Sequence, residues 1–191
     1  MPVNLALTDV LLSVAVGVGL AAAVGLRVFL PMLVLGIAAR LGWTTLGADF
    51  AWIASNVGLA ALAVATVAEV AAYQFPAIDN ALDAVATPIA IAAGVVAIAA
   101  VTSELPAPLR WSLAVVAGGG TAGLVQSLTT IARLKSTGFT AGLANPFLAG
   151  AELTGAAVVA VLAVSAPLLA IALVVSLVWI LRRTTRALAR R

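Results

Sequence analysis

The sequence contains no cysteine and no histidine among its 191 residues. Disulfide bonds, thiolate or imidazole zinc sites, iron–sulfur clusters, histidine-ligated haem and Cys–His catalysis are therefore excluded. Any metal would have to be a hard cation held by carboxylate and carbonyl oxygens. We expect neither a metal site nor a cofactor.

Charge is also scarce, since only 9% of the residues are charged, compared with about 25% in an ordinary soluble domain. Hydrophobic residues make up 64% of the chain, and several nearly uncharged stretches approach the roughly 20 residues that cross a bilayer. The composition predicts an all-α, polytopic membrane helix bundle. Residues 1–183 are expected to form one integral membrane domain, followed by a basic cytoplasmic tail at 184–191.

That tail explains the basic character of the chain. Five of the ten basic residues lie in the last ten positions, directly after an apolar stretch: Arg182, Arg183, Arg186, Arg190 and Arg191. A basic segment beside a membrane helix sets its orientation and attracts anionic headgroups. We therefore expect the bilayer, and not nucleic acid, as its partner.

The apolar stretches and the signals that interrupt them predict six membrane-spanning helices. Asn56 and Asn145 are interpreted as helix caps, and Thr87-Pro88 as the start of the third helix. Residues 136–146 are too polar for a helix in lipid, so they form either a loop or a re-entrant segment that lines a cavity. The six helices are predicted at about 9–40, 57–75, 88–101, 109–135, 145–164 and 167–181.

The first helix carries Arg27 and Pro31 near its middle, which makes it a candidate for a kink or a break inside the membrane. A charge at that depth costs about 3 kcal/mol on insertion scales unless it finds a partner. Gly25, like the triplet Gly118, Gly119 and Gly120, lets a neighbouring helix approach closely. For the triplet the alternative is that backbone carbonyls face a pathway.

The two halves of the chain, about 9–102 and 109–183, share an order of parts. Each has a long glycine-bearing helix, a polar turn, a helix that opens at an asparagine, a proline-marked break and a third helix. Three spans per half would make the second half inverted relative to the first, as in many secondary transporters. The positive-inside rule then places both termini in the cytoplasm. Glu69 and Glu152 fall at similar depth in this arrangement.

The polar residues expected to line a substrate or ion pathway lie on or beside these helices. For each carboxylate the alternative is solvation at the headgroup level or a structural pair with Arg133 or Lys135. Intramembrane ionisable groups favour the functional interpretation. The candidates are Arg27, Glu69, Asp79, Asp83, Arg133, Asn145 and Glu152.

Three blocks carry a resemblance to a known family: GLRVFLP at 25–31, PAIDNALD at 76–83 and NPFLAGAE at 145–152. With these blocks nearly the whole chain resembles a family of small bacterial integral membrane proteins catalogued as a domain of unknown function. The resemblance implies a multi-pass protein of the bacterial inner membrane. The chain departs from the family pattern in two places. Tyr73 and Gln74 stand where members tend to carry an Asp-Lys pair, and Gln126 stands where a histidine is expected.

Three classes of function remain open: a small transporter or channel for a polar or charged solute, a membrane assembly or lipid-organising protein, and an intramembrane enzyme. No nucleophile elbow or metal motif supports the enzyme, so none is expected. A chain of this size often needs a second copy to enclose a pathway, so a homodimer is one expectation.

Overall fold

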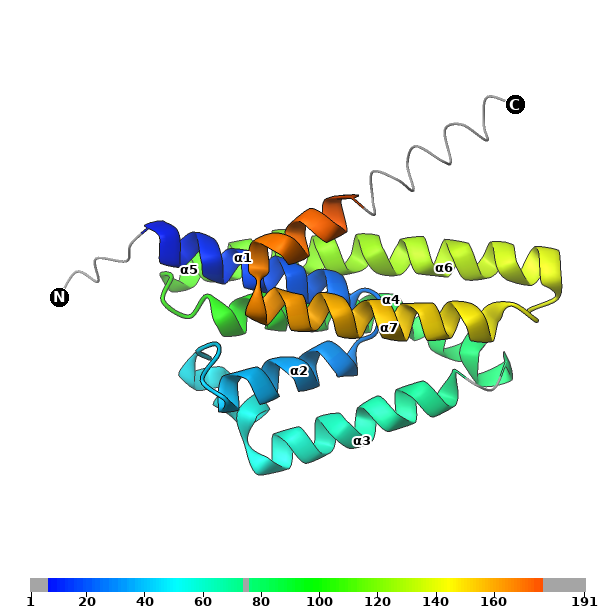
Figure 1. Cartoon of the computed structure of the whole chain (residues 1–191), viewed down its shortest axis with the longest axis horizontal. Coiled ribbons are helices and arrows are strands. Elements are labelled where there is room, and N and C mark those ends of the chain that lie inside the picture. Colours follow the sequence, from blue (N-terminus) through cyan, green and yellow to red (C-terminus); the bar gives the residue numbers. More distant parts are fainter. Residues whose placement is uncertain (1–6, 74–75, 177–191) are drawn as a thin grey trace, which may run out of the picture.

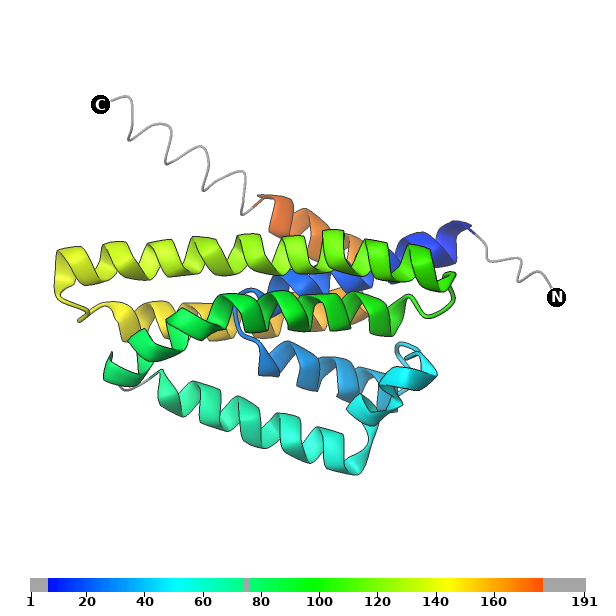
Figure 2. The ribbon, with the colours of Figure 1, turned by 180° about the vertical axis from the view of Figure 1, so that it is seen from behind.

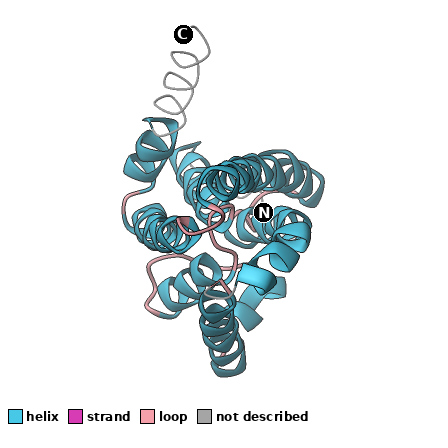
Figure 3. Cartoon of the chain, turned by 90° about the vertical axis from the view of Figure 1, so that its right-hand side faces the viewer, coloured by secondary structure: helices cyan, strands magenta, loops and turns pink. Residues whose placement is uncertain are grey.

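A computed structural model of the protein describes residues 7–73 and 76–176, with the side chains of residues 76–84 outside this description. Every regular element in these ranges is a helix and none is a strand (Figure 3). The predicted all-α class is confirmed for this part of the chain. Residues 177–191, which include the end of the predicted sixth helix and the basic tail, lie outside it.

The first helical stretch is interrupted between α1 (Leu7–Val24) and α2 (Phe29–Arg40). The predicted break is therefore confirmed, but a single helix over 9–40 is wrong. Figure 1 shows that α1 and α2 run in opposite directions along the long axis, so the chain turns back inside the bundle. Pro31 does not cause the break, because it lies in the first turn of α2, where a backbone N–H has no intrahelical acceptor to lose.

A short 3₁₀ helix, η1 (Ala48–Ala54), leads into α3 (Asn56–Ala72), and the two axes are bent by 60°. The hydroxyl of Ser55 accepts the N–H of Gly58 at 2.9 Å. Ser55 is therefore the cap, and the prediction that Asn56 caps this helix is wrong. In Figures 1 and 3 α3 is the lowest helix, set apart from the main bundle, and it packs mainly on α2 and η1.

The next helix, α4 (Pro76–Val101), is continuous through Pro88. Thr87-Pro88 is therefore not a helix start, as the sequence predicted. Pro76 occupies the favoured first position, whereas Pro88 removes one backbone hydrogen bond from the interior. Figure 2 shows the first turns of α4 at an angle to the rest, the usual response to an internal proline.

The longest helical stretch runs over residues 107–140 as α5 (Ala107–Leu113), the π-helical turn η2 (Ala114–Gly119) and α6 (Gly120–Thr140). Residues 136–140 are thus helical, not the loop or re-entrant segment that the sequence predicted. The turn is confined to residues 141–144, where Ala141 and Gly142 have φ of 51° and 85°. These left-handed residues end the helix.

The glycine triplet serves close packing at two of its three positions. A Cβ on Gly94 of α4 would lie 2.6 Å from the carbonyl oxygen of Gly118, and Gly119 faces Ile91 and Val95 of α4. Nothing lies within 4 Å of a Cβ on Gly120. Gly25 also belongs to the packing group, because its Cβ would lie 2.6 Å from the carbonyl oxygen of Ala122.

The last long helix, α7 (Asn145–Ser165), packs across both α1 and α2. Its cap is Ala144, so the prediction that Asn145 caps it is wrong, while Pro146 lies in its first turn. The predicted interruption at 165–167 is confirmed, since Ala166 separates α7 from the short helix Pro167–Ser176. Alanine and valine side chains of α1, α4 and α7 supply much of the core.

By length and composition, three helical stretches among the described residues could cross a membrane: 7–24, 107–140 and 145–165. The bent pair of η1 and α3 adds a fourth, and three shorter apolar helices accompany them. The turns near residues 41–55, 102–106 and 165–167 lie at one end of the bundle, and the 141–144 turn lies at the other (Figure 1). Because α2 turns back, Leu7 lies at the same end of the bundle as residues 41–55. The arrangement predicted from the sequence instead places Leu7 at the end that holds the 141–144 turn.

Candidate functional site

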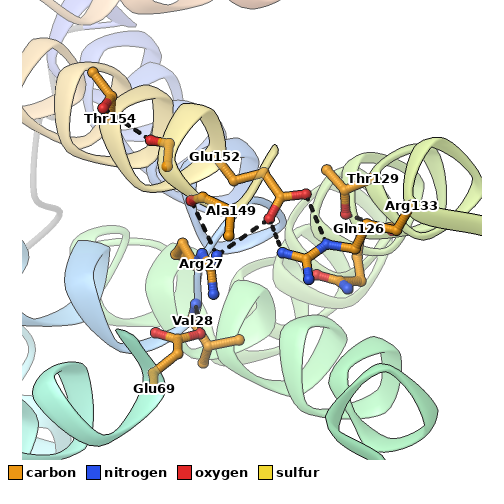
Figure 4. Close-up of polar contacts among 10 residues, drawn as sticks. Arg27, Val28, Glu69, Gln126, Thr129, Arg133, Ala149, Glu152 and Thr154 are labelled. Carbon is orange, nitrogen blue, oxygen red and sulfur yellow. Dashed lines mark hydrogen bonds and ion pairs between the residues drawn. The ribbon is translucent and has the colours of Figure 1, made fainter. Parts of the chain in front are cut away.

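Charged side chains meet at the break between α1 and α2. Arg27 lies in this break and is 3% exposed. Glu69 approaches from α3, Arg133 from α6 and Glu152 from α7, so that four elements far apart in sequence contribute to one cluster (Figure 4). Both glutamates reach the break between α1 and α2, since Glu69 contacts Val28 and Phe29 and Glu152 contacts Arg27.

Glu152 is shared by two arginines. Its Oε1 accepts Nε–H of Arg133 at 3.1 Å, and its Oε2 accepts Nη2–H of the same guanidinium. Nη2 of Arg27 lies 3.4 Å from Oε2 and donates to the carbonyl oxygen of Ala149 at 3.1 Å. The two-point contact between Arg133 and Glu152 fixes the orientation of both side chains as well as pairing their charges. The carboxylate partner that Arg27 requires is therefore Glu152.

Glu69 accepts hydrogen bonds from the backbone at the start of α2. Its two carboxylate oxygens accept the backbone N–H groups of Val28 at 3.0 Å and Phe29 at 3.2 Å. These N–H groups open α2, where the helix macrodipole is positive and the first donors lack intrahelical partners. Glu69, which lies on α3, therefore caps the N-terminus of α2. Among the described residues, no cation lies within ion-pair distance of it.

An aromatic ring accompanies the arginines. The guanidinium carbon of Arg27 lies 3.6 Å from the centroid of the Tyr73 ring, and that of Arg133 lies 4.3 Å from it. Both distances are within the range of cation–π attraction, which strengthens where water is excluded. Nε and Nη1 of Arg27 are buried and have no hydrogen-bond partner. The contact with the Tyr73 ring partly compensates the buried charge of the Arg27 guanidinium.

Two cavities flank the cluster. One, of about 340 Å³, reaches Glu69, Tyr73 and Gln126. The other, of about 350 Å³, lies against α1, α6 and α7 and reaches Glu152, Thr129 and Lys135. Leu26, next to Arg27, contributes to the walls of both. Arg27 itself lines neither cavity.

The remaining predicted site residues do not join the cluster in the described structure. Asn145 donates from Nδ2 to Oγ1 of Thr137 at 3.1 Å, across the 141–144 turn. Pro31 and the glycines discussed above shape the backbone and the helix packing. Asp79 and Asp83 lie on α4, and their side chains are outside the described residues.

The sequence did not predict a role for Tyr73 or Gln126. Gln126 is buried at 5% exposure and lines the first cavity together with Tyr73. One available signal was that both positions depart from the family pattern. A polar residue in the middle of an apolar helix, such as Gln126, can itself indicate an inward-facing position.

The described residues contain no group of three aspartate, glutamate, histidine or cysteine side chains that could hold a metal ion. The chemistry of this site therefore rests on ion pairs, backbone donors and an aromatic ring.

Comparison with known proteins finds no curated protein and no solved structure that matches the chain. A family profile does match, and it extends over residues 14–187, which include every residue of the charged cluster. The chain thus belongs to the family described as a domain of unknown function, DUF4126.

Proposed function

We propose that the protein is a small membrane transporter or channel that moves a small polar or charged solute past Arg27, Glu69 and Glu152. The observation that carries this proposal is the buried charged cluster at a helix break with a cavity on either side. Ionisable groups within membrane segments are expensive and generally functional. Non-helical backbone at membrane depth is tolerated where protein buries it or where it lines a cavity.

The two cavities support a path that leads through the cluster. Leu26 belongs to both walls, so the segment between the cavities is the non-helical stretch that carries Arg27. Glu69 and Glu152 come from different halves of the chain and meet at this stretch. We propose that the solute passes between the halves here, as the inverted-repeat interpretation expects.

For orientation, we propose that the 141–144 turn faces the cytoplasm of a bacterium, with the protein in the inner membrane. Arg133 and Lys135 precede this turn, and the arginine-rich tail follows the last apolar stretch. The positive-inside rule favours the cytoplasm for both. Since α2 turns back, the start of α1 would then face the opposite side.

A membrane assembly or lipid-organising role is the second candidate, and one observation favours it. Among the described side chains the cluster holds two arginines and two glutamates, whose formal charges sum to zero, and Glu152 is paired with both arginines. A self-compensated cluster can serve architecture alone. In that case its charges would matter for folding and not for flux.

Flux measurements separate the two candidates. Glu69→Gln keeps the shape of the side chain and removes its charge, and it should abolish solute flux in proteoliposomes while the protein stays folded. Glu104→Gln removes the same charge from an exposed position in the 102–106 loop and should leave flux unchanged. A folded wild-type protein that passes no ion or small solute in a broad screen would refute transport and favour the assembly role.

A further inference from the structure

The cavity that reaches Glu69 lies between α3 and α4, and its wall is almost entirely apolar. Alanine, valine and isoleucine side chains from the two helices form most of it, with Leu26, Val28 and Phe29 from the break. The polar groups are Glu69, Tyr73 and Gln126, which contribute a carboxylate, a phenol and an amide. A volume of about 340 Å³ is within the range of small-molecule sites.

Among the described residues of this wall, Glu69 is the only charged one. It is half-buried, and each of its oxygens accepts one backbone N–H. An ionised carboxylate offers about four lone-pair positions, so acceptor capacity remains on both oxygens. No cation among the described residues pairs with it.

The two arginines of the cluster do not line this cavity. Arg133 and Arg27 are directed to Glu152, and both guanidinium groups lie against the ring of Tyr73. Among the described residues that line the cavity, Glu69 is therefore the charged side chain that a ligand would meet. A carboxylate in an apolar wall, with no described cation within ion-pair distance, is complementary to a positively charged ligand, because a buried charge is costly unless it is paired.

We propose that this cavity binds a small organic cation, an amine or quaternary ammonium with an apolar body, and that Glu69 is its counter-ion. The apolar body would occupy the space between α3 and α4, and the cationic group would lie at Glu69 and Gln126. That such a cation is also the transported solute rests on the proposed function. That the cavity binds the cation does not.

Three ligands of nearly equal size and different charge test the proposal: benzylammonium, benzyl alcohol and benzoate. Binding is measured by thermal melting and calorimetry on the full chain in lipid nanodiscs. We expect saturable binding and a raised melting temperature with benzylammonium alone. Preferential binding of benzoate, equal binding of all three ligands, or no binding of any would overturn the proposal.

Two variants locate the site. Glu69→Gln should weaken benzylammonium binding by more than about tenfold, since it removes one partner of a buried charge pair. Glu104→Gln, in the 102–106 loop, should bind as the wild type does. Because Glu69 also caps α2, a second variant avoids that role: Ala86→Phe fills the cavity from α4 and should block binding with Glu69 intact. Undiminished binding to a folded Ala86→Phe protein would refute the site.

The binding and flux results are independent. Benzylammonium binding without any solute flux would support this site and contradict transport. Flux of other solutes without benzylammonium binding would contradict the cation site alone.

Discussion

Nη2 of Arg27 lies 3.4 Å from Oε2 of Glu152, and both side chains are nearly inaccessible to solvent. This contact joins the break of the first helical hairpin to α7. The same carboxylate also contacts Arg133, so one glutamate forms ion pairs with two buried guanidinium groups. Substitutions at these positions should therefore differ in their effect on the stability of the protein, and this difference can be measured.

Removal of Glu152 should be more damaging than removal of Arg27. Glu152→Gln takes from Arg27 the carboxylate that it contacts and also takes one ion pair from Arg133. Breaking a buried pair by removing one partner costs about 3–5 kcal/mol. Arg27→Gln leaves Glu152 paired with Arg133 and should cost less. The apparent free energy of unfolding, from titration with a denaturing detergent, gives the order.

The double variant provides the control for this pairing. Glu152→Gln combined with Arg27→Gln should be more stable than Glu152→Gln alone, because the double variant no longer buries the Arg27 charge without its carboxylate. Strictly additive losses in the double variant would show that Arg27 and Glu152 are not coupled.

The cap that Glu69 provides should be visible in the backbone of α2. Glu69→Ala removes the acceptors of the Val28 and Phe29 N–H groups and should destabilise the start of the helix by about 1–2 kcal/mol. Amide hydrogen exchange should accelerate at these two residues and not at the end of α2. Unchanged exchange there would contradict the cap.

The glycine positions predict a contrast between two similar substitutions. Gly118→Ala should be destabilising, because Gly118 and Gly94 bring the backbones of η2 and α4 into direct contact. Gly120→Ala should be neutral or stabilising by up to about 1 kcal/mol, since its Cβ meets nothing within 4 Å and alanine is the better helix former. Equal effects in melting experiments would refute the packing role of Gly118.

The reversal between α1 and α2 predicts the sidedness of the chain. Single cysteines are informative here because the natural sequence has none. Asp9→Cys and Asp49→Cys should be labelled from the same side of the membrane, and Gly142→Cys from the other. Labelling of positions 9 and 142 from one side would instead support a first helix that crosses the bilayer completely.

Local composition was sufficient to predict much of this protein. Apolar length predicted the helices, and an arginine beside glycine and proline made residues 25–31 a candidate for a kink or a break. Glu69 and Glu152 were predicted at matching depth from their distance to helix ends. Their convergence on Arg27 then required only that the helices pack side by side.

Other features depend on tertiary context that the sequence does not encode locally. Thr87-Pro88 has the same local pattern as a helix start, yet the helix continues because one lost hydrogen bond is tolerated within α4. The turning back of the chain at Gly25 is set by packing against α6. The position of Tyr73 against two arginines joins residues 46 and 60 positions apart (73−27 and 133−73).

The central claim is that a solute path passes the helix break at Arg27. Leu26 borders both cavities, so Leu26→Cys places a single thiol on that path. In proteoliposomes, a small membrane-impermeant thiol reagent should modify Cys at position 26 and block solute flux, with protection by the transported solute. A thiol at position 26 that stays unreactive in the active protein, while one at position 142 in the 141–144 turn reacts, would contradict a path through this site.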